Sequence, residues 1–205
     1  AYSLDSMEEL YKILECTQNA QDLELFVRLR IPNDSAKIEL SSKFGVLPEE
    51  SAELLRVTSQ VCAKLGVCFH VGSQSMDPAD FAIAIAKTKQ AVTEAGVELD
   101  VLDVGGGFPA AYPGFMPPSL TQYMESITRA VADANFGPQV ELICEPGRAM
   151  VAEGGSVIVR VELRKGDALY LNDGTYGSLF DAGSLKWNYP MRAIRPDGKF
   201  SKKMQ

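Results

Sequence analysis

Residues 99–109 read Leu-Asp-Val-Leu-Asp-Val-Gly-Gly-Gly-Phe-Pro, an apolar run that ends in three glycines. Val and Leu dominate the first six residues, which is typical of a buried strand. Three successive residues without a Cβ atom let backbone amides surround an anion, and phosphate suits such a turn. The glycine spacing does not match the Gly-x-Gly-x-x-Gly pattern of dinucleotide-binding loops. By itself the stretch predicts either a phosphate-binding turn or merely a flexible one.

Apolar runs of the same kind recur on both sides of this one, with helix-like segments between them. Further strands are expected at residues 25–31, 66–70 and 140–144. Helices are expected at residues 7–16, 49–65, 78–95 and 120–134. The spacing of the strand ends matches βαβ units, which need about 30 or more residues each, so the sheet is expected to be parallel.

Two closures of a parallel sheet are open, a doubly wound sheet or a (β/α)₈ barrel. Polar or glycine-rich clusters follow all four strands, and a barrel gathers such clusters around one mouth, whereas an open sheet uses mainly its switch point. The clusters therefore favour the barrel. Beyond residue 150 the helix-length spacers disappear, and strand-like segments at 156–163 and 168–172 are separated by a turn. The predicted fold class is α/β, with residues 1–149 forming part of a barrel and residues 150–205 the start of a C-terminal β domain.

Composition excludes several classes of function. The 205 residues carry a formal net charge of −7, which gives no positive field to attract nucleic acid or anionic lipid. No window is apolar for long enough to span a membrane. The four cysteines lack paired metal-ligand spacing, and Cys68 and Cys144 lie in apolar runs that predict burial. Reduced thiols and a cytoplasmic location are expected.

Two further clusters carry chemistry. Glu145 and Arg148 follow the strand at 140–144, with Gly147 allowing a sharp bend between them. Arg clasps phosphate oxygens, and a buried carboxylate holds a proton on a ring nitrogen, although a surface salt bridge is the commoner meaning of such a pair. His70 ends another strand and precedes Ser73, so contact with a planar ligand is favoured over a core histidine.

In this order, the motifs resemble those of the fold-type III pyridoxal-phosphate decarboxylases, particularly the ornithine decarboxylases and their bacterial lysine/ornithine branch. The motifs are His-Val-Gly-Ser-Gln at 70–74, Asp-Val-Gly-Gly-Gly-Phe-Pro at 103–109, Glu-Pro-Gly-Arg at 145–148 and Asn-Asp-Gly-Thr-Tyr-Gly-Ser-Leu-Phe-Asp-Ala-Gly at 172–183. Arg-Leu-Arg-Ile at 28–31 and Ser-Lys-Phe-Gly at 42–45 are similar to upstream elements of that family.

The resemblance implies pyridoxal 5'-phosphate as cofactor and assigns roles to residues. Glu145 would pair with the pyridine nitrogen, and His70 would lie against the ring face. Arg30 and Lys43 would sit near the ring substituents. The implied holders of the phosphate are Ser73, Gly105, Gly106, Gly107, Gly147 and Arg148. A protonated pyridine ring is the electron sink that decarboxylation needs, and a carboxylate beside its nitrogen keeps it protonated.

The implied reaction is decarboxylation of a basic amino acid, foremost L-ornithine to putrescine in polyamine biosynthesis. Lysine or diaminopimelate as substrate, or a non-catalytic regulatory homologue, are the alternatives. A homodimer with shared active sites is implied as well. Tyr176 would lie near the dimer contact or pack as a hairpin aromatic, and Asp181 would recognise substrate or cap a turn.

Two family elements have no match in this sequence. The lysine that holds the cofactor covalently would precede Ala1, and Lys43 is not that lysine. A segment whose Cys and Asp serve the partner subunit would follow Gln205. The chain is therefore expected to be a fragment or a middle section of such an enzyme.

Overall fold

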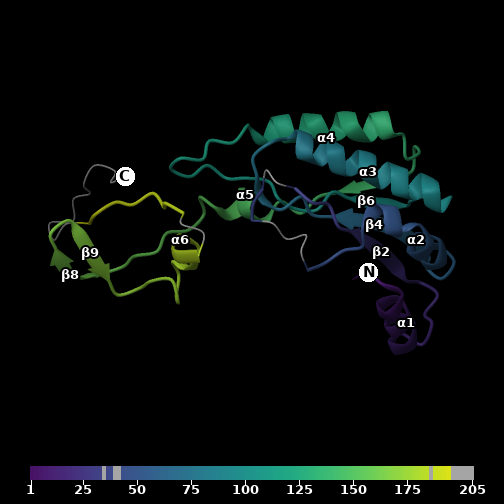
Figure 1. The fold of residues 1–205 in the computed structure, drawn as a ribbon, viewed down its shortest axis with the longest axis horizontal. Helices are drawn as coiled ribbons and strands as arrows, with labels where there is room; N and C mark the ends of the chain where they lie inside the picture. The colour runs from purple at the N-terminus through teal and green to yellow at the C-terminus, as the bar shows by residue number, and fades with distance from the viewer. Residues whose placement is uncertain (34–35, 39–42, 185–186, 195–205) are drawn as a thin grey trace. The chain divides into compact units, whose positions relative to one another are not determined.

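The structure is a computed structural model that describes residues 1–33, 36–38, 43–184 and 187–194 (Figure 1). Its contacts divide the chain into two compact units. The first comprises Ala1–Pro109 and Pro117–Ala149, and the second comprises Ala110–Met116 and Met150–Gln205.

A five-stranded parallel sheet forms the centre of the first unit. Its strands are β1 (Tyr2–Leu4), β2 (Glu24–Leu29), β4 (Lys64–Phe69), β6 (Val101–Asp103) and β7 (Glu141–Ile143). They lie side by side in the order β1-β2-β4-β6-β7, and each neighbouring pair is parallel. A doubly wound sheet reverses its order at a switch point, whereas strands that follow chain order are typical of a barrel wall.

Helices connect these strands. They are α1 (Met7–Cys16), α2 (Ala52–Ser59), α3 (Ala79–Ala95) and α4 (Leu120–Ala134), with a short 3₁₀ turn η1 (Pro48–Glu50) before α2. The bounds predicted for α1 and α4 are confirmed, and α3 begins one residue late. The helix expected at 49–65 is wrong in its last turns, because Lys64 and Leu65 pair with Glu24 and Leu25 in the sheet.

Helix ends follow the local chemistry of the chain. The Ser119 hydroxyl accepts the N–H of Gln122, whose side chain returns to the Ser119 N–H, a capping box that fixes the start of α4. Gly96 ends α3 in the left-handed conformation, φ 68°, which costs glycine little. The start of α1 is capped by Ser6, whose hydroxyl accepts the N–H of Glu9 (3.2 Å).

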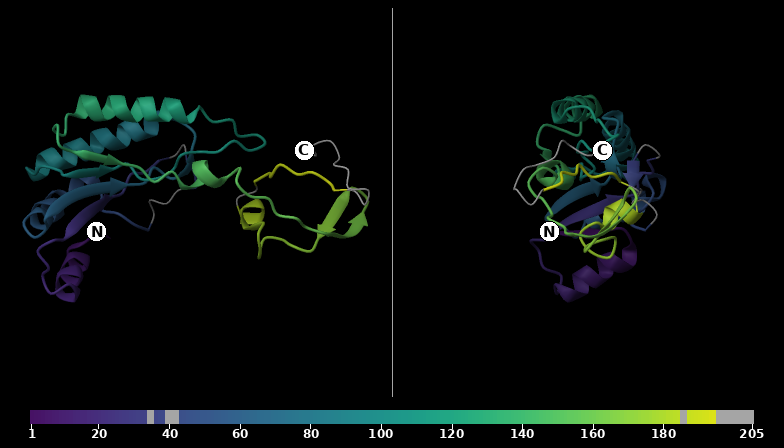
Figure 2. Two further views of the ribbon diagram at one scale, coloured as in Figure 1. Left: turned by 180° about the vertical axis from the view of Figure 1, so that it is seen from behind. Right: turned by 90° about the vertical axis from the view of Figure 1, so that its left-hand side faces the viewer.

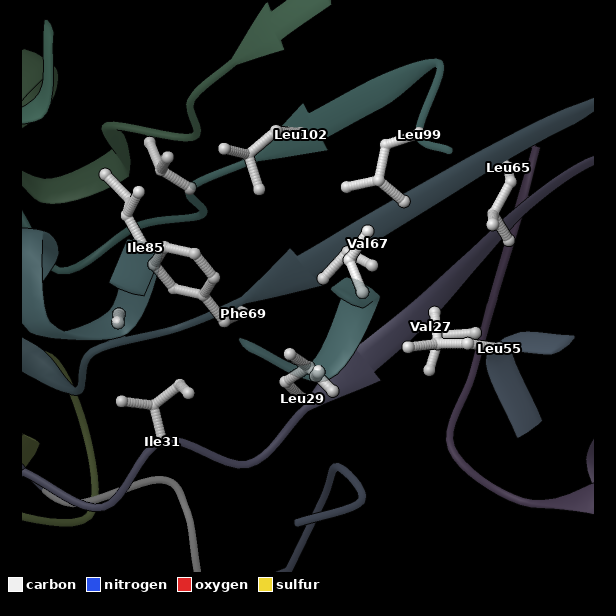
Figure 3. Packing of buried hydrophobic residues seen from close by; sticks show 14 of the residues in the cluster. Val27, Leu29, Ile31, Leu55, Leu65, Val67, Phe69, Ile85, Leu99 and Leu102 are labelled. Atoms are coloured by element: carbon white, nitrogen blue, oxygen red, sulfur yellow. The ribbon is translucent and has the colours of Figure 1, made fainter. Parts of the chain in front are cut away.

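Helices α2, α3 and α4 cover one face of the sheet, and Figure 2 shows α3 and α4 on that same side from behind. Alternate residues of β2 and β4 point into this layer, as a two-residue repeat requires. Leu55 and Ile85 of the helices lie among them (Figure 3). The buried strand residues of this cluster are Leu4, Leu25, Val27, Leu29, Leu65, Val67, Phe69 and Leu102. Their burial from water is the main force that holds the layers together.

The opposite face of the sheet carries polar and charged side chains. Arg28 of β2 is paired with Cys68 of β4, and Cys68 with Asp103 of β6, so the three share this face. Two residues earlier on the same two strands, Gly66 is paired with Phe26, and a Cβ on Gly66 would collide with the Phe26 ring. The glycine thus makes room for an aromatic ring inside this face.

Two smaller sheets complete the described chain. β3 (Ala36–Ile38) and β5 (Ser73–Ser75) pair antiparallel in the first unit. In the second unit β8 (Val161–Lys165) and β9 (Ala168–Leu171) form the hairpin that the sequence predicts, although the strand expected from residue 156 begins only at Val161. A short helix, α6 (Phe180–Ser184), follows.

The structure bears on two expectations, the absence of a membrane-spanning segment and the burial of Cys68 and Cys144. Within the described residues, no helix is both long and apolar enough to cross a membrane. All four cysteines are free thiols, and Cys68 is half-buried, but the burial predicted for Cys144 is wrong because it follows the edge strand β7 and is exposed.

Candidate functional site

The predicted site residues gather at one edge of the five-stranded sheet. Arg30, His70, Gly105 and Glu145 follow the carboxyl ends of β2, β4, β6 and β7. Parallel strands bring such ends to the same edge. The main chain continues the ladder there, because Val104 donates its N–H to Ile143 O (2.9 Å) and Glu145 donates its N–H to Gly105 O (2.8 Å).

Each glycine of the triple-glycine turn has a steric reason within the chain. A Cβ on Gly105 would collide with Phe69 O, and its φ is +65°. A Cβ on Gly106 would lie 2.8 Å from Glu145 O and 3.0 Å from His70 Nε2. Gly107, with φ +114°, would place a Cβ 2.6 Å from Gly72 O. The turn therefore packs tightly between the loops after β4 and β7, and larger residues would push these loops apart.

The turn also presents backbone donors. Gly105 donates its N–H to the Asp103 carboxylate (2.8 Å). Among the described residues, the N–H groups of Gly106 and Gly107 meet no hydrogen-bond acceptor. Gly106 is buried, and a buried backbone donor in a native protein almost always has a partner. Two adjacent amides of this kind fit the phosphate of the predicted cofactor.

His70 is held as a neutral imidazole. Gly72 donates its N–H to His70 Nδ1 (2.9 Å), so the ring proton belongs on Nε2. Burial, assisted by the positive charge of Arg28, lowers the pKa of His70. The Nε2 edge faces Gly106, which confirms that the histidine and the glycine turn are neighbours.

The lowered pKa predicts how His70 affects stability. Between its folded pKa and the ordinary value of about 6.5, the unfolded chain binds a proton that the folded chain does not. The contribution of His70 to the free energy of unfolding is fully present above this pH window, and it is lost as the pH falls through the window. In the full-length protein, His70→Gln should remove part of the decline in the urea midpoint between about pH 8 and pH 5. If the urea midpoint of the variant fell with pH as steeply as that of the wild type, the expectation would be contradicted.

Glu145 differs from its prediction. A buried carboxylate is expected, but the residue is exposed, since it follows the edge strand of the sheet. The neighbouring chain still desolvates its carboxylate, and this partial burial with the negative charge of Asp103 raises the pKa of Glu145, while Arg28 opposes the rise. Its carbonyl accepts the N–H of Gly147 (2.8 Å), which turns the chain toward α5 (Gly147–Val151).

The predicted cationic residues lie in different settings. Arg148 is half-buried in α5. Arg30 is half-buried, and its Nε atom has no hydrogen-bond partner among the described residues, as expected of a group that meets a ligand. Lys43 is exposed and stacks its ammonium on the Phe44 ring, 4.7 Å from the centroid.

The remaining predicted residues have simpler surroundings. Ser73 is half-buried and pairs with Ile38 across the β3–β5 ladder. Nothing lies within 4 Å of a Cβ on Gly147, so the chain's own packing does not demand that glycine. Tyr176 is fully exposed, which rules out the packed-hairpin alternative. Asp181 lies in the first turn of α6.

Sequence reasoning missed two charged residues of this face. Arg28 acts on the pKa of both His70 and Glu145, and Asp103 acts on Glu145 and holds the Gly105 amide. The signal was present in the alternation of the strands, because Arg28 and Asp103 each stand two residues before a recognised site position. The charges of Arg28 and Asp103 therefore act on the titration of the site residues.

Comparison with known proteins assigns the family. The model of the family described as pyridoxal-dependent decarboxylase, pyridoxal binding domain, matches residues 1–152. The chain belongs to this family, and the predicted cofactor is confirmed by it.

Two curated relatives show the level of similarity. Ornithine decarboxylase of Schizosaccharomyces pombe is 34% identical over 187 residues, covering 86% of this chain and 41% of that protein. Lysine/ornithine decarboxylase of Selenomonas ruminantium is 30% identical over 210 residues, covering 98% of this chain and 51% of that protein. The chain thus spans about half the length of the relatives it matches.

Solved structures of decarboxylases have a fold similar to that of this chain. Diaminopimelate decarboxylase from Helicobacter pylori, complexed with L-lysine, superposes with a TM-score of 0.79 at 26% identity over 95% of this chain and 52% of that one. Lysine/ornithine decarboxylase from Vibrio vulnificus, complexed with putrescine, has a TM-score of 0.76 at 28% identity over 95% and 52% of the two chains. The predicted fold class, part of a (β/α)₈ barrel, is confirmed.

Proposed function

We propose that the protein to which this chain belongs decarboxylates a basic amino acid with pyridoxal 5'-phosphate, and that L-ornithine, which yields putrescine, is the substrate. The observation that carries the proposal is the meeting of the triple-glycine turn, His70 and the Glu145 main chain at one edge of the sheet. This edge lies within the region that matches the pyridoxal-binding domain.

The phosphate would be held mainly by main-chain donors. The N–H groups of Gly106 and Gly107 are the donors that the described chain leaves without an acceptor. The guanidinium of Arg148, three residues after Glu145, adds a charge-assisted bond to the anion. Ser73, Gly105 and Gly147 complete the proposed phosphate site.

Glu145 and His70 would act on the ring. Bound pyridoxal phosphate would supply an electron sink for the electron pair that stays on the α-carbon when CO₂ departs. The Glu145 carboxylate holds the proton on the ring nitrogen by opposing its charge. His70 lies against the ring face, and its neutrality avoids a second positive charge beside the protonated ring. Arg30 would contact a polar ring substituent with its Nε atom, for which the described part of the chain provides no partner.

Support for the substrate comes from the relatives. Their names include ornithine, lysine/ornithine, arginine and diaminopimelate decarboxylases. All these substrates carry a cationic or amphoteric group at the far end of the side chain, so the class is a basic amino acid. Ornithine is favoured because it is named in both of the curated relatives described above. Lysine and diaminopimelate are the alternatives for the assay.

A homodimer with shared active sites also belongs to this proposal, with the fully exposed Tyr176 as a contact. The cytoplasmic location remains a prediction from the sequence.

The proposal is tested with the full-length protein. Purified protein with added pyridoxal phosphate should show the absorbance of bound cofactor and release CO₂ from ornithine faster than from lysine or diaminopimelate. Release from lysine or diaminopimelate alone would correct the substrate and keep the reaction. Protein that binds no cofactor and releases no CO₂ would contradict the proposal and favour the non-catalytic homologue.

A further inference from the structure

A partly buried polar network is attached to the loops of the proposed phosphate site, and the proposed chemistry does not use it. Its centre is the Asp80 carboxylate, in the first turn of α3. Asn33 donates its side-chain N–H to Asp80 Oδ2 (2.9 Å), and Ser75 donates its hydroxyl to the same oxygen. One carboxylate oxygen thus joins two segments that are far apart along the chain.

These two partners belong to loops that carry site residues. Asn33 follows β2 three residues after Arg30, and it also donates to Val71 O (2.7 Å) in the loop after β4. Ser75 ends the segment that contains His70 and Ser73. Asp80 therefore connects the loops after two neighbouring strands, and each loop contributes a side chain to the proposed site.

A third loop is attached through Ser75. Its backbone N–H donates to Gly107 O (3.0 Å), the last residue of the triple-glycine turn. The Ser75 carbonyl accepts a hydrogen bond from the hydroxyl of Tyr123 (2.8 Å). Burial and the nearby carboxylates of Asp77 and Asp80 raise the pKa of Tyr123, so its hydroxyl stays protonated and remains a donor.

The network rests on a rigid support. Phe81, next to Asp80, is fully buried and stacks on Phe108 with ring centroids 4.7 Å apart. Tyr123 packs edge-on against both rings. Phe108 directly follows the glycine turn, so the start of α3, α4 and the turn share one aromatic cluster.

The loop that Asp80 holds is strained without such support. Gln74 is fully buried and has a φ of +58°, a conformation that residues with a Cβ seldom adopt. Strain of this kind persists only where surrounding contacts over-determine the backbone. The hydroxyl and amide of Ser75, the next residue, provide such contacts on either side.

We propose that Asp80 is a positioning residue of the cofactor site, which sets the loops after β4 and β6 at the spacing that lets Ser73 and Gly107 grip the cofactor phosphate. The inference rests on the proposed function. It predicts that loss of Asp80 weakens the hold on the phosphate group more than the hold on the pyridine ring.

The test compares cofactor forms with and without phosphate. Equilibrium dialysis of the full-length apoprotein would give dissociation constants for pyridoxal phosphate and for pyridoxal. Asp80→Ala should raise the constant for pyridoxal phosphate about tenfold, as expected for a displaced hydrogen bond, and change that for pyridoxal much less. Asp80→Asn should lie between, since its amide oxygen still accepts from Ser75.

Asp77→Asn is the matched control. Asp77 sits at the same helix end and accepts the N–H of Ala79 (2.9 Å), which asparagine can also do. The control should bind both compounds as the wild type does. A general loss of stability would raise both dissociation constants together and leave their ratio unchanged, so the ratio separates positioning from folding.

The ratio of the two dissociation constants decides whether Asp80 positions the cofactor site. An unchanged ratio in folded Asp80→Ala and Asp80→Asn, or in Ser75→Ala if Asp80→Ala does not fold, would overturn the inference. Failure of all three variants to fold would also overturn it, since Asp80 would then serve the whole fold. Wild-type protein that binds neither compound would reject the proposed function itself, a result distinct from variants that bind as the wild type does.

Discussion

Replacing Glu145 by alanine in the full-length protein should slow decarboxylation about 100-fold or more, the scale seen when one preorganised charge partner of a transition state is removed. The carboxylate opposes the positive charge on the ring nitrogen, and alanine cannot do so. Binding of pyridoxal phosphate should suffer less, because its phosphate is held by other groups. Turnover number and cofactor affinity, measured separately, check the expectation.

Two companion variants sharpen this experiment. Glu145→Gln keeps the shape of the side chain and removes its charge, so it should be as slow as Glu145→Ala if charge is the cause. Glu141→Gln removes a carboxylate from the other end of β7 and should leave turnover unchanged. Equal turnover in the wild type and both Glu145 variants would reject the role in stabilising charge on the ring.

Replacing Arg148 by alanine should weaken binding of pyridoxal phosphate by about 1.5–3 kcal/mol, or about tenfold to 150-fold in the dissociation constant, the range for a lost bond to a charged group. Affinity for pyridoxal, which has no phosphate, should hardly change. Equilibrium dialysis with both compounds measures the difference.

The controls for Arg148 address charge and geometry. Arg148→Lys keeps the charge but loses the planar fork, so it should recover only part of the affinity. Arg129→Ala removes an exposed guanidinium from α4, which changes the net charge by the same amount. If Arg129→Ala weakened binding as much as Arg148→Ala, the effect would be one of overall charge and the phosphate contact would be excluded.

Local patterns were sufficient for much of the fold. The exact bounds of α1 and α4 follow from apolar periodicity and serine caps, which involve residues within one or two turns. The parallel sheet follows from the spacing of apolar runs. The errors fall where a neighbour in space decides, as at the end of α2, the start of β8, and the exposure of Cys144 and Glu145.

The site shows the same division. Motif order led to His70, the triple glycine and Glu145, and the structure brings their main chains together. Arg28 and Asp103 each begin a quoted motif, but no role was assigned to either residue, and strand pairing shows that they share the face. The Asp80 network was also invisible, because Asn33 and Asp80 lie 47 residues apart.

Amino-acid order alone therefore established the presence of helices α1 to α4 and of strands β2, β4, β6 and β7, and the family that the motifs resemble. Tertiary structure decided the order of the strands, the steric need for each glycine of the triple-glycine turn, the neutral form of His70 and the carboxylate that joins the loops after β2 and β4. The physical reason is that helix caps and apolar repeats depend on neighbours along the chain, whereas side-chain contacts at the ends of parallel strands depend on register between segments separated by a whole helix.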